Sequence, residues 1–297
     1  MRDPLLWLLV IVILCLALPA SAGKKLIEFG WDVPTPSYLK DHITEMEQKP
    51  FDGVILRLIG DFEGKHYEAY QAWAKVPFAE EAIPFFIEEL KAVKFDKFTD
   101  NFLLAWSTPG DTDWYSDEEF GVFVQNMRLL ARVAKQAGLK GICFDNEPYG
   151  EKKPWLWMDQ PGHEARSFSE YSAKARMRGR ELMKAIGEGY PDITFMTLFG
   201  FTSSQNVWDQ KPFQKALSEW WLGGLYPAFL NGVIEAMPKG ARFLDGHEWG
   251  YYYGSKAEFL QGYWNMVSGC KHLVLPQNWK RYREVLSAGF GLYVLPS

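Results

Sequence analysis

Two acidic residues directly follow a short apolar run in the middle of the chain. The run Gly141–Phe144 is followed by Asp145, Asn146, Glu147 and Pro148. Carboxylates at the end of a buried strand are costly unless they are paired, hydrogen-bonded or used in a reaction. Alternate side chains of a strand share a face, so Asp145 and Glu147 should lie together and Asn146 on the opposite side. Because neighbouring carboxylates raise the pKa of one member, this pair could keep a proton near neutral pH.

A protonated carboxyl group beside a second carboxyl group suits the hydrolysis of glycosidic bonds. One carboxyl protonates the leaving oxygen, and another group stabilises or attacks the sugar carbon. Aromatic residues make up 16% of the chain and include 13 Trp, more than a core requires. Their rings could stack on the apolar faces of sugars. The sequence therefore predicts a site that acts on carbohydrate.

Strand-like and helix-like segments alternate along the chain. The predicted strands are residues 25–30, 51–60, 101–107, 140–147, 193–201, 241–249 and 290–295. The predicted helices are residues 37–48, 80–94, 117–137, 167–187, 212–221, 226–237, 255–267 and 281–288. For the helix of residues 117–137, Ser116 is the expected N-cap and Gly138 lies just past the end.

This alternation predicts an α/β fold built on a parallel sheet covered on both faces. Seven units in one chain fit a (β/α)₈ barrel of the TIM type better than a doubly wound sheet. A dinucleotide-binding fold requires a glycine-rich phosphate loop after its first strand, and the first predicted strand of this chain lacks one. The eighth unit is either missing or built differently, and we expect that the last unit is missing. No linker divides residues 23–297, which we expect to form one catalytic domain.

Reacting groups of such barrels stand at the carboxyl ends of the strands. Acids and large aromatic residues concentrate at these ends in this sequence. The candidate catalytic residues are Glu147, Asp145, Glu248 and Asp245. The candidate substrate-binding residues are Trp31, Asp32, Arg57, Trp106, Asn146, Tyr149, His247 and Trp249.

The end of the fourth predicted strand resembles motifs of two glycosidase families. Asn146-Glu147-Pro148 resembles the acid/base motif of the clan A retaining glycoside hydrolases. Asp145-Asn146-Glu147 also resembles the Asp-x-Glu motif of chitinase-like, substrate-assisted enzymes. Both families are (β/α)₈ barrels, and either resemblance implies that Glu147 is the proton donor. The resemblance covers these few residues and the architecture.

The sequence departs from both families at the second catalytic group. Clan A enzymes place a nucleophilic Glu at the end of strand seven, where this chain has Tyr293-Val294-Leu295. The chitinase-like pattern has further aspartates upstream, where this chain has Ile142-Cys143-Phe144. The second carboxyl group is therefore open between Glu248, Asp245 and a residue of a missing eighth unit.

Other roles for these residues remain open from the sequence. Asp145 and Glu147 could form structural ion pairs with Arg57. The acids could also hold calcium together with Asp111 and Asp113, since oxygen ligands suit that ion. His247 could be a hydrogen-bonded residue of the rim or a catalytic base.

Three functions compete. We expect a glycoside hydrolase acting on a polysaccharide or oligosaccharide without a cofactor, and the alternative is a carbohydrate-binding barrel without turnover. A metal-dependent hydrolase is disfavoured because the five His residues show no metal-binding spacing. The net charge of −5 argues against nucleic acid as a partner.

The first 22 residues predict a secretory signal peptide. Met1-Arg2 precedes the apolar run Leu5–Leu18 and a small-residue exit that ends at Ala22. A membrane anchor is the alternative, but the run is shorter than a span requires. We expect a secreted or periplasmic protein that has no membrane contact after cleavage. The remaining cysteines, Cys143 and Cys270, are expected to be free thiols.

Overall fold

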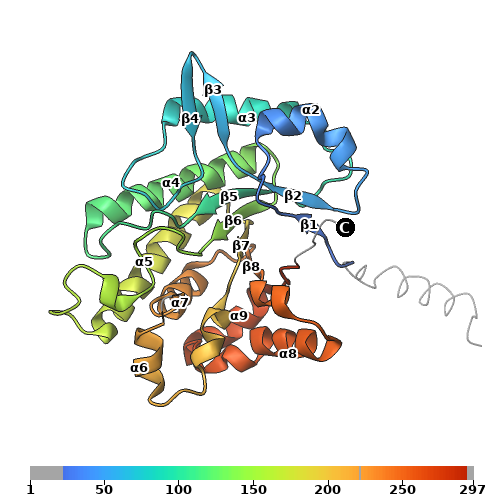
Figure 1. The fold of residues 1–297 in the computed structure, drawn as a ribbon. Helices are drawn as coiled ribbons and strands as arrows, with labels where there is room; N and C mark the ends of the chain where they lie inside the picture. Colours follow the sequence, from blue (N-terminus) through green and yellow to red (C-terminus); the bar gives the residue numbers. More distant parts are fainter. Residues whose placement is uncertain (1–22, 221, 293–297) are drawn as a thin grey trace, which may run out of the picture.

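The structure, a computed structural model, describes residues 23–220 and 222–292. The predicted signal peptide lies outside the described residues. The described chain folds around a seven-stranded parallel sheet with the order β1-β2-β5-β6-β7-β8-β9, and β3 and β4 form a separate antiparallel hairpin (Figure 1). The sheet strands are β1 (Ile27–Glu28), β2 (Gly53–Leu56), β5 (Phe102–Trp106), β6 (Gly141–Asp145), β7 (Thr194–Thr197), β8 (Arg242–Asp245) and β9 (Leu286–Ala288).

The strands of the sheet follow one another in chain order. A doubly wound sheet reverses its order at a switch point, and this sheet has no such reversal. Among the described residues, β1 and β9 each pair with a single neighbour, so the curled sheet stays open between them. The molecule is therefore an α/β fold with a curled parallel sheet of seven strands.

The helices begin and end close to the predicted positions. They are α2 (Pro36–Met46), α3 (Ile83–Ala92), α4 (Asp117–Gln136), α5 (Phe168–Gly189), α6 (Phe213–Ser218), α7 (Tyr226–Ala236), α8 (Lys256–Val267) and α9 (Trp279–Val285). Short 3₁₀ helices are η1 (Glu80–Ala82), η2 (Trp157–Asp159), η3 (Phe201–Val207), η4 (Glu248–Tyr252), η5 (Gly269–His272) and η6 (Pro276–Asn278). As predicted, Ser116 caps α4, and its hydroxyl accepts a hydrogen bond from the backbone N–H of Glu119 at 3.1 Å.

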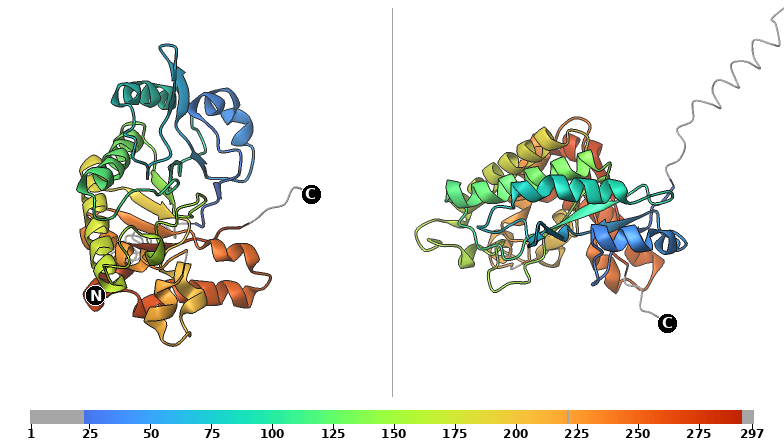
Figure 2. Two further views of the ribbon diagram at one scale, coloured as in Figure 1. Left: turned by 60° about the vertical axis from the view of Figure 1, so that its left-hand side comes forward. Right: turned by 90° about the horizontal axis from the view of Figure 1, so that it is seen from above.

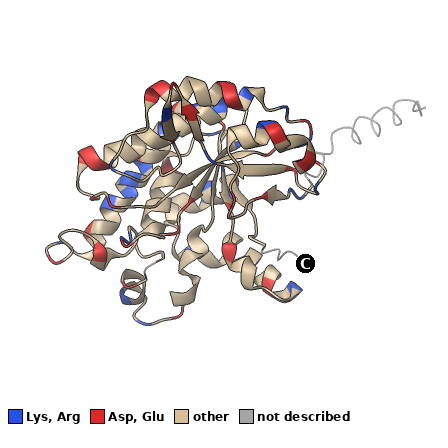
Figure 3. Cartoon of the chain, turned by 45° about the horizontal axis from the view of Figure 1, so that its top comes forward, with Lys and Arg blue, Asp and Glu red and all other residues tan. Residues whose placement is uncertain are grey.

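The two faces of the sheet carry different side chains. Ile142 and Phe144 of β6 belong to the large apolar core between the sheet and the helices. Cys143 faces the other way, into a smaller cluster that includes Ile55 and Leu104 on neighbouring strands. We call this second side the inner face. Most Lys, Arg, Asp and Glu residues lie outside the strands (Figure 3). Both Cys143 and Cys270 are buried free thiols, as predicted.

Helices α4, α5 and α7 lie side by side against the outer face (Figures 1 and 2). The contact between α5 and α7 is very close because it passes through two glycines. A Cβ atom at Gly179 would lie 2.1 Å from the carbonyl oxygen of Phe229, and one at Gly232 would lie 1.9 Å from that of Arg176. Only glycine permits this approach of the two backbones.

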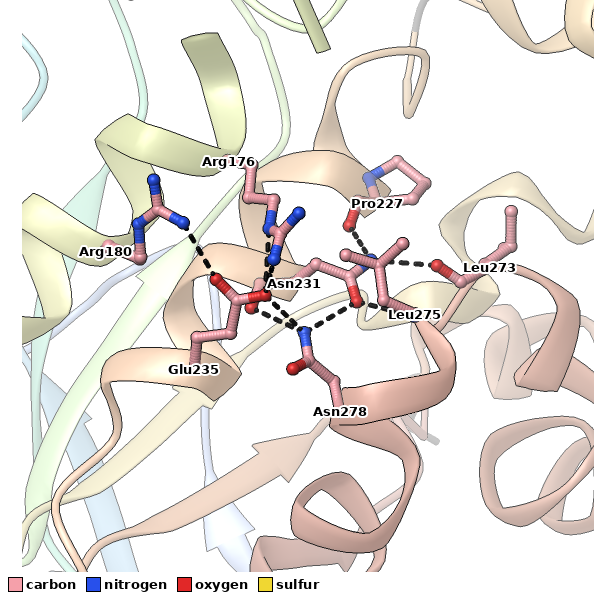
Figure 4. A network of polar contacts seen from close by, with 8 residues as sticks. All are labelled: Arg176, Arg180, Pro227, Asn231, Glu235, Leu273, Leu275 and Asn278. Carbon is pink, nitrogen blue, oxygen red and sulfur yellow. Dashed lines mark hydrogen bonds and ion pairs between the residues drawn. The ribbon is translucent and has the colours of Figure 1, made fainter. Parts of the chain in front are cut away.

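A buried polar network joins α7 to the segment before α9 (Figure 4). The Asn231 amide donates to the carbonyl oxygens of Pro227 and Leu273, both at 2.8 Å, and accepts from the backbone N–H of Leu275 at 2.8 Å. Asn278 donates to Glu235 at 2.9 Å. Glu235 also forms ion pairs with arginines of α5, namely Arg176 and Arg180. Side chains thus satisfy buried backbone groups where the chain runs without regular structure.

Several predicted strands are wrong in length or place. The predicted strands of residues 193–201 and 241–249 end at Thr197 and Asp245. The segment predicted as one strand over residues 51–60 ends at Leu56, and the hairpin of β3 (Ile59–Phe62) and β4 (Lys65–Glu68) follows. The last strand is Leu286–Ala288, inside a predicted helix, where its register pairs Asp245 with Ala288. Of the predicted strand at residues 290–295, residues 290–292 are not a strand, and residues 293–297 lie outside the described residues. The apolar side chain of Phe290 packs on the Phe259 ring instead of belonging to a strand, with 5.2 Å between the ring centroids.

Candidate active site

Asp145 is a buried acid at the carboxyl end of β6. Its side chain lies on the inner face, is 2% exposed, and accepts a hydrogen bond from the backbone N–H of Glu147 at 3.0 Å. Burial raises the pKa of Asp145 well above its ordinary value, and the charges of Glu147 and Glu248 act in the same direction. The charged form of Asp145 is therefore disfavoured relative to that of an exposed aspartate.

Glu147 stands next to Asp145 and is partly exposed. The Tyr149 hydroxyl donates to Oε2 of Glu147 at 2.5 Å. The end of β5 holds this segment, because the Ser107 hydroxyl donates to the carbonyl oxygen of Glu147 at 2.9 Å and the Tyr149 N–H donates to the Thr108 hydroxyl at 3.2 Å. These contacts fix the direction of the Glu147 carboxyl group.

Glu248 follows the end of β8 and belongs to the same cluster of charges. It is 6% exposed, and its Oε1 accepts a hydrogen bond from the Tyr251 hydroxyl at 2.6 Å. Burial raises the pKa of Glu248 to about 7; the Tyr251 hydrogen bond opposes this shift, and the charge of Glu147 adds to it. Within residues 23–220 and 222–292, no Lys, Arg or His forms an ion pair with Asp145, Glu147 or Glu248. Three uncompensated acids therefore share this edge of the sheet.

A row of aromatic rings leads from these acids along the inner face. The Tyr149 ring lies 5.9 Å from the Trp106 ring, and the Trp106 ring lies 5.2 Å from the Tyr70 ring. The Arg57 guanidinium carbon lies 5.7 Å from the centre of the Tyr70 ring. The sequence predicted Arg57, Trp106 and Tyr149 as neighbours of a substrate, and the structure places them along one row.

The candidate residues chosen from the sequence did not include Tyr70 or Tyr251. Tyr251 lies three residues after Glu248 in an aromatic triplet, which was a usable signal once Glu248 was a candidate. Tyr70 has no such signal, because it comes from the segment after the unpredicted hairpin, where its carbonyl accepts the Trp106 N–H at 2.7 Å.

The other predicted binding residues do not join this row of rings. Trp31 is 89% exposed, and Asp32 next to it is exposed as well. Trp249 packs against the Phe199 ring, and its indole N–H donates to the carbonyl oxygen of Thr202 at 3.0 Å. Asn146 is fully buried, and its side-chain oxygen accepts the Phe199 N–H at 3.1 Å. Asn146 therefore links the end of β6 to the segment after β7 and is not exposed to solvent.

Asp245 and His247 form a second buried polar group, at the end of β8. Asp245 shares the helix-facing side of β8 with Phe243, and its Oδ1 accepts backbone N–H groups of Gly200 and His247, both at 3.0 Å. The His247 ring contacts the hydroxyls of Thr202 at 2.9 Å and Tyr253 at 2.8 Å. Burial lowers the pKa of His247 to about 4 and raises that of Asp245 to about 7. The side chain of Asp245, a predicted catalytic residue, thus lies on the opposite face of the sheet from that of Asp145.

The raised pKa of Asp245 predicts a dependence of stability on pH. Since the folded-state pKa of about 7 exceeds the ordinary value of 3.8, the folded state binds the proton more tightly. This contribution to stability is complete below the ordinary pKa and is lost as pH rises through about 7. Asp245→Asn should keep the acceptor oxygen and remove this loss. Between pH 4.5 and 8.5, the free energy of unfolding of the variant relative to the parent should rise by about 2 to 4 kcal/mol.

Urea unfolding at several pH values measures this difference. The exposed acid Asp41 supplies the matched control, because Asp41→Asn removes an acid that is not buried. A relative stability of Asp245→Asn that does not change with pH would show that Asp245 ionises normally in the folded protein.

The structure bears on the two alternatives involving cations. Among the described residues, no group of three or more His, Cys, Asp or Glu side chains could hold a metal ion. Asp113 takes part in the turn before α4, where its carboxylate accepts the Tyr115 N–H at 2.9 Å. Arg57 forms no ion pair with Asp145 or Glu147 within the described chain.

No helix of the described residues has the length and apolar character to cross a bilayer.

Two hollows of the surface lie away from these acids. One, of about 210 Å³, lies between α3 and α4. The other, of about 510 Å³, lies between α2, α3 and the β3–β4 hairpin. Neither contains a carboxyl group of the cluster, and we place the candidate site at the acids because the reactive groups are there.

Comparison with known proteins adds little. No protein-family model and no curated protein matches the chain. One solved structure that matches is described as "a putative dehydratase from Mesorhizobium loti", with 8% sequence identity and a TM-score of 0.34. The match covers 90% of this chain and 55% of the other, so this chain spans about half of that protein's length. At this level of similarity the match carries no argument about function.

Proposed function

We propose that the protein is a glycoside hydrolase that acts on a polysaccharide or oligosaccharide through Glu147 and Glu248. The observation that carries the proposal is the cluster of Asp145, Glu147 and Glu248 at the carboxyl edge of a parallel sheet. Burial raises the pKa of two of these acids, Asp145 and Glu248, and that of Glu248 reaches about 7. A carboxyl group with such a pKa can donate a proton near neutral pH and recover it from water.

We assign the proton donor to Glu248 and the stabilising or attacking carboxylate to Glu147. Of these two acids, Glu248 is the buried one with the raised pKa, whereas Glu147 is partly exposed and oriented by Tyr149. The motif resemblance supports the opposite assignment, with Glu147 as the donor. Asp145 is buried and acts as a positioning residue, since its Oδ1 atom accepts a hydrogen bond from the backbone N–H of Glu147.

The aromatic side chains supply the sugar-binding surface in this proposal. Trp106, Tyr149 and Tyr251 stand beside the acids, and each is at least partly exposed. Aromatic rings offer large contact areas together with polar edges, which suits ligands with apolar and hydroxylated faces. The same surface supports the alternative function, carbohydrate binding without turnover.

We also propose that the curled sheet is the main part of a (β/α)₈ barrel. The open edge between β1 and β9 would accept one further strand, and the chain-order arrangement of the strands supports this architecture. Residues 1–22 would direct the protein to the periplasm or the exterior, where polysaccharides occur.

A screen of polysaccharides tests the proposal, with the release of reducing ends as the readout. The parent should hydrolyse at least one member of a broad panel. The double variant Glu147→Gln/Glu248→Gln should bind the same polysaccharide within about threefold of the parent and release no sugar. Binding without turnover by the parent would favour the alternative function. Equal turnover by the double variant would exclude both residues from the chemistry.

A further inference from the structure

Arg57 carries a positive charge on the inner face without a compensating acid. Its backbone N–H donates to the carbonyl oxygen of Pro34 at 3.0 Å, which anchors it at the end of β2. Its side chain is half-buried beside the Tyr70 ring. The Nε atom is buried and has no hydrogen-bond partner among the described residues, and no carboxylate there lies within ion-pair distance of Arg57.

Other shielded arginines of this protein have acidic partners. Arg178 is buried and contacts Asp117 at 2.6 Å and Glu181 at 2.7 Å. Arg176 is paired with Glu235. Shielding a guanidinium group from water is costly unless an anion or hydrogen-bond acceptors replace the water. Arg57 therefore differs from these arginines in lacking the acid that such a position normally requires.

The position of Arg57 connects it to the candidate active site. The rings of Tyr70, Trp106 and Tyr149 form a continuous row from Arg57 to Glu147. A sugar chain with one unit at Glu147 that extends in the direction of this row would bring a more distant unit of the same chain to Arg57. The planar guanidinium group binds oxyanions such as carboxylate and sulfate through paired hydrogen bonds.

We propose that Arg57 binds an anionic group on a sugar unit further along the bound chain from the one that reacts, and hence that the substrate is an acidic polysaccharide. The proposal rests on the proposed function, because it takes the acids as the reaction centre. The group that Arg57 would bind is an oxyanion on a sugar, which can be the carboxylate of a uronic acid or a sulfate ester.

Binding of matched oligosaccharides tests the proposal. The protein carries Glu147→Gln so that ligands are not consumed, and dissociation constants are measured by calorimetry. One arm compares hexuronate oligosaccharides with the same compounds after reduction of the carboxyl groups. A second arm compares sulfated oligosaccharides with their desulfated forms. Arg57→Gln is compared with Arg132→Gln, which removes an equal charge from an exposed position on α4.

In one arm the acidic ligand should bind at least tenfold more tightly than its neutral form. Arg57→Gln should weaken binding of that acidic ligand by about 10- to 100-fold and change binding of its neutral form less than twofold. Arg132→Gln should change neither. The arm that shows this pattern identifies the anion.

Three results would overturn the proposal. Equal binding of the acidic and neutral forms would remove the anion preference. Equal weakening of both forms by Arg57→Gln would indicate a structural role. Failure of every acidic ligand to bind would exclude acidic sugars, while the polysaccharide screen with the Glu147/Glu248 double variant would still decide the proposed function on its own.

Discussion

Glu147→Gln is expected to lower kcat on a polysaccharide by about 10⁴-fold. The amide has nearly the same shape as the carboxyl group, but it carries no negative charge to attack or stabilise the sugar carbon. Tyr149 could still donate its hydrogen bond to the amide oxygen, so the fold and the sugar-binding surface should remain. The effect should therefore appear in kcat, with the dissociation constant of the sugar within about threefold of the parent.

Steady-state kinetics and a binding titration on the same preparation measure this prediction. Glu151→Gln is the matched control, because Glu151 is an exposed acid four residues further along the same loop. The control should match the parent in both measurements. A Glu147→Gln variant that turns over substrate at the parental rate would remove Glu147 from the mechanism.

Glu248→Gln is expected to reduce kcat by about 10²- to 10⁴-fold on natural substrates. Aryl glycosides whose leaving groups need no proton should lose much less, because the missing group is the proton donor. The parent should also lose activity above about pH 7 as Glu248 ionises, and the variant should lack this limb of the pH profile. Rates on aryl glycosides of graded leaving-group pKa, measured across pH, test both effects.

Tyr251→Phe tests the pKa of Glu248 without changing Glu248 itself. The Tyr251 hydroxyl donates to Glu248 and lowers its pKa, so its removal should shift the alkaline limb to higher pH without abolishing turnover. If the activated substrates instead rescue Glu147→Gln and not Glu248→Gln, the two roles are exchanged, and Glu147 is the donor as the motif resemblance implies.

Strand periodicity predicted the central part of the candidate site. The inner position of Asp145 and the opposite direction of Asn146 both follow from the period of two. The same rule places Asp245 on the side of Phe243, toward the helices, and it was not applied there. What periodicity could not give is the distance between segments. The approach of Glu248 to Glu147 depends on how far the sheet curls across β7, and no local pattern encodes that curvature.

The parallel sheet was predictable, but its last strand was not. An apolar run of strand-like composition at residues 290–295 competed with the short segment Leu286–Ala288. The three residues that pair with β8 have too little pattern of their own, and their pairing is set by tertiary contact. The hairpin of β3 and β4 was missed for a similar reason, because its strands are short and none of their residues is fully buried.

The glycine contact between α5 and α7 also has a consequence for motion. Where the two helices cross, their backbones touch at Gly179 and Gly232, and no side chain separates them there. They should therefore move as a single rigid body, with slow amide hydrogen exchange along the shared surface. Any movement that admits and releases a long sugar chain would then occur in the connections after β6 and β8, which carry Glu147 and Glu248, while α5 and α7 stay in place.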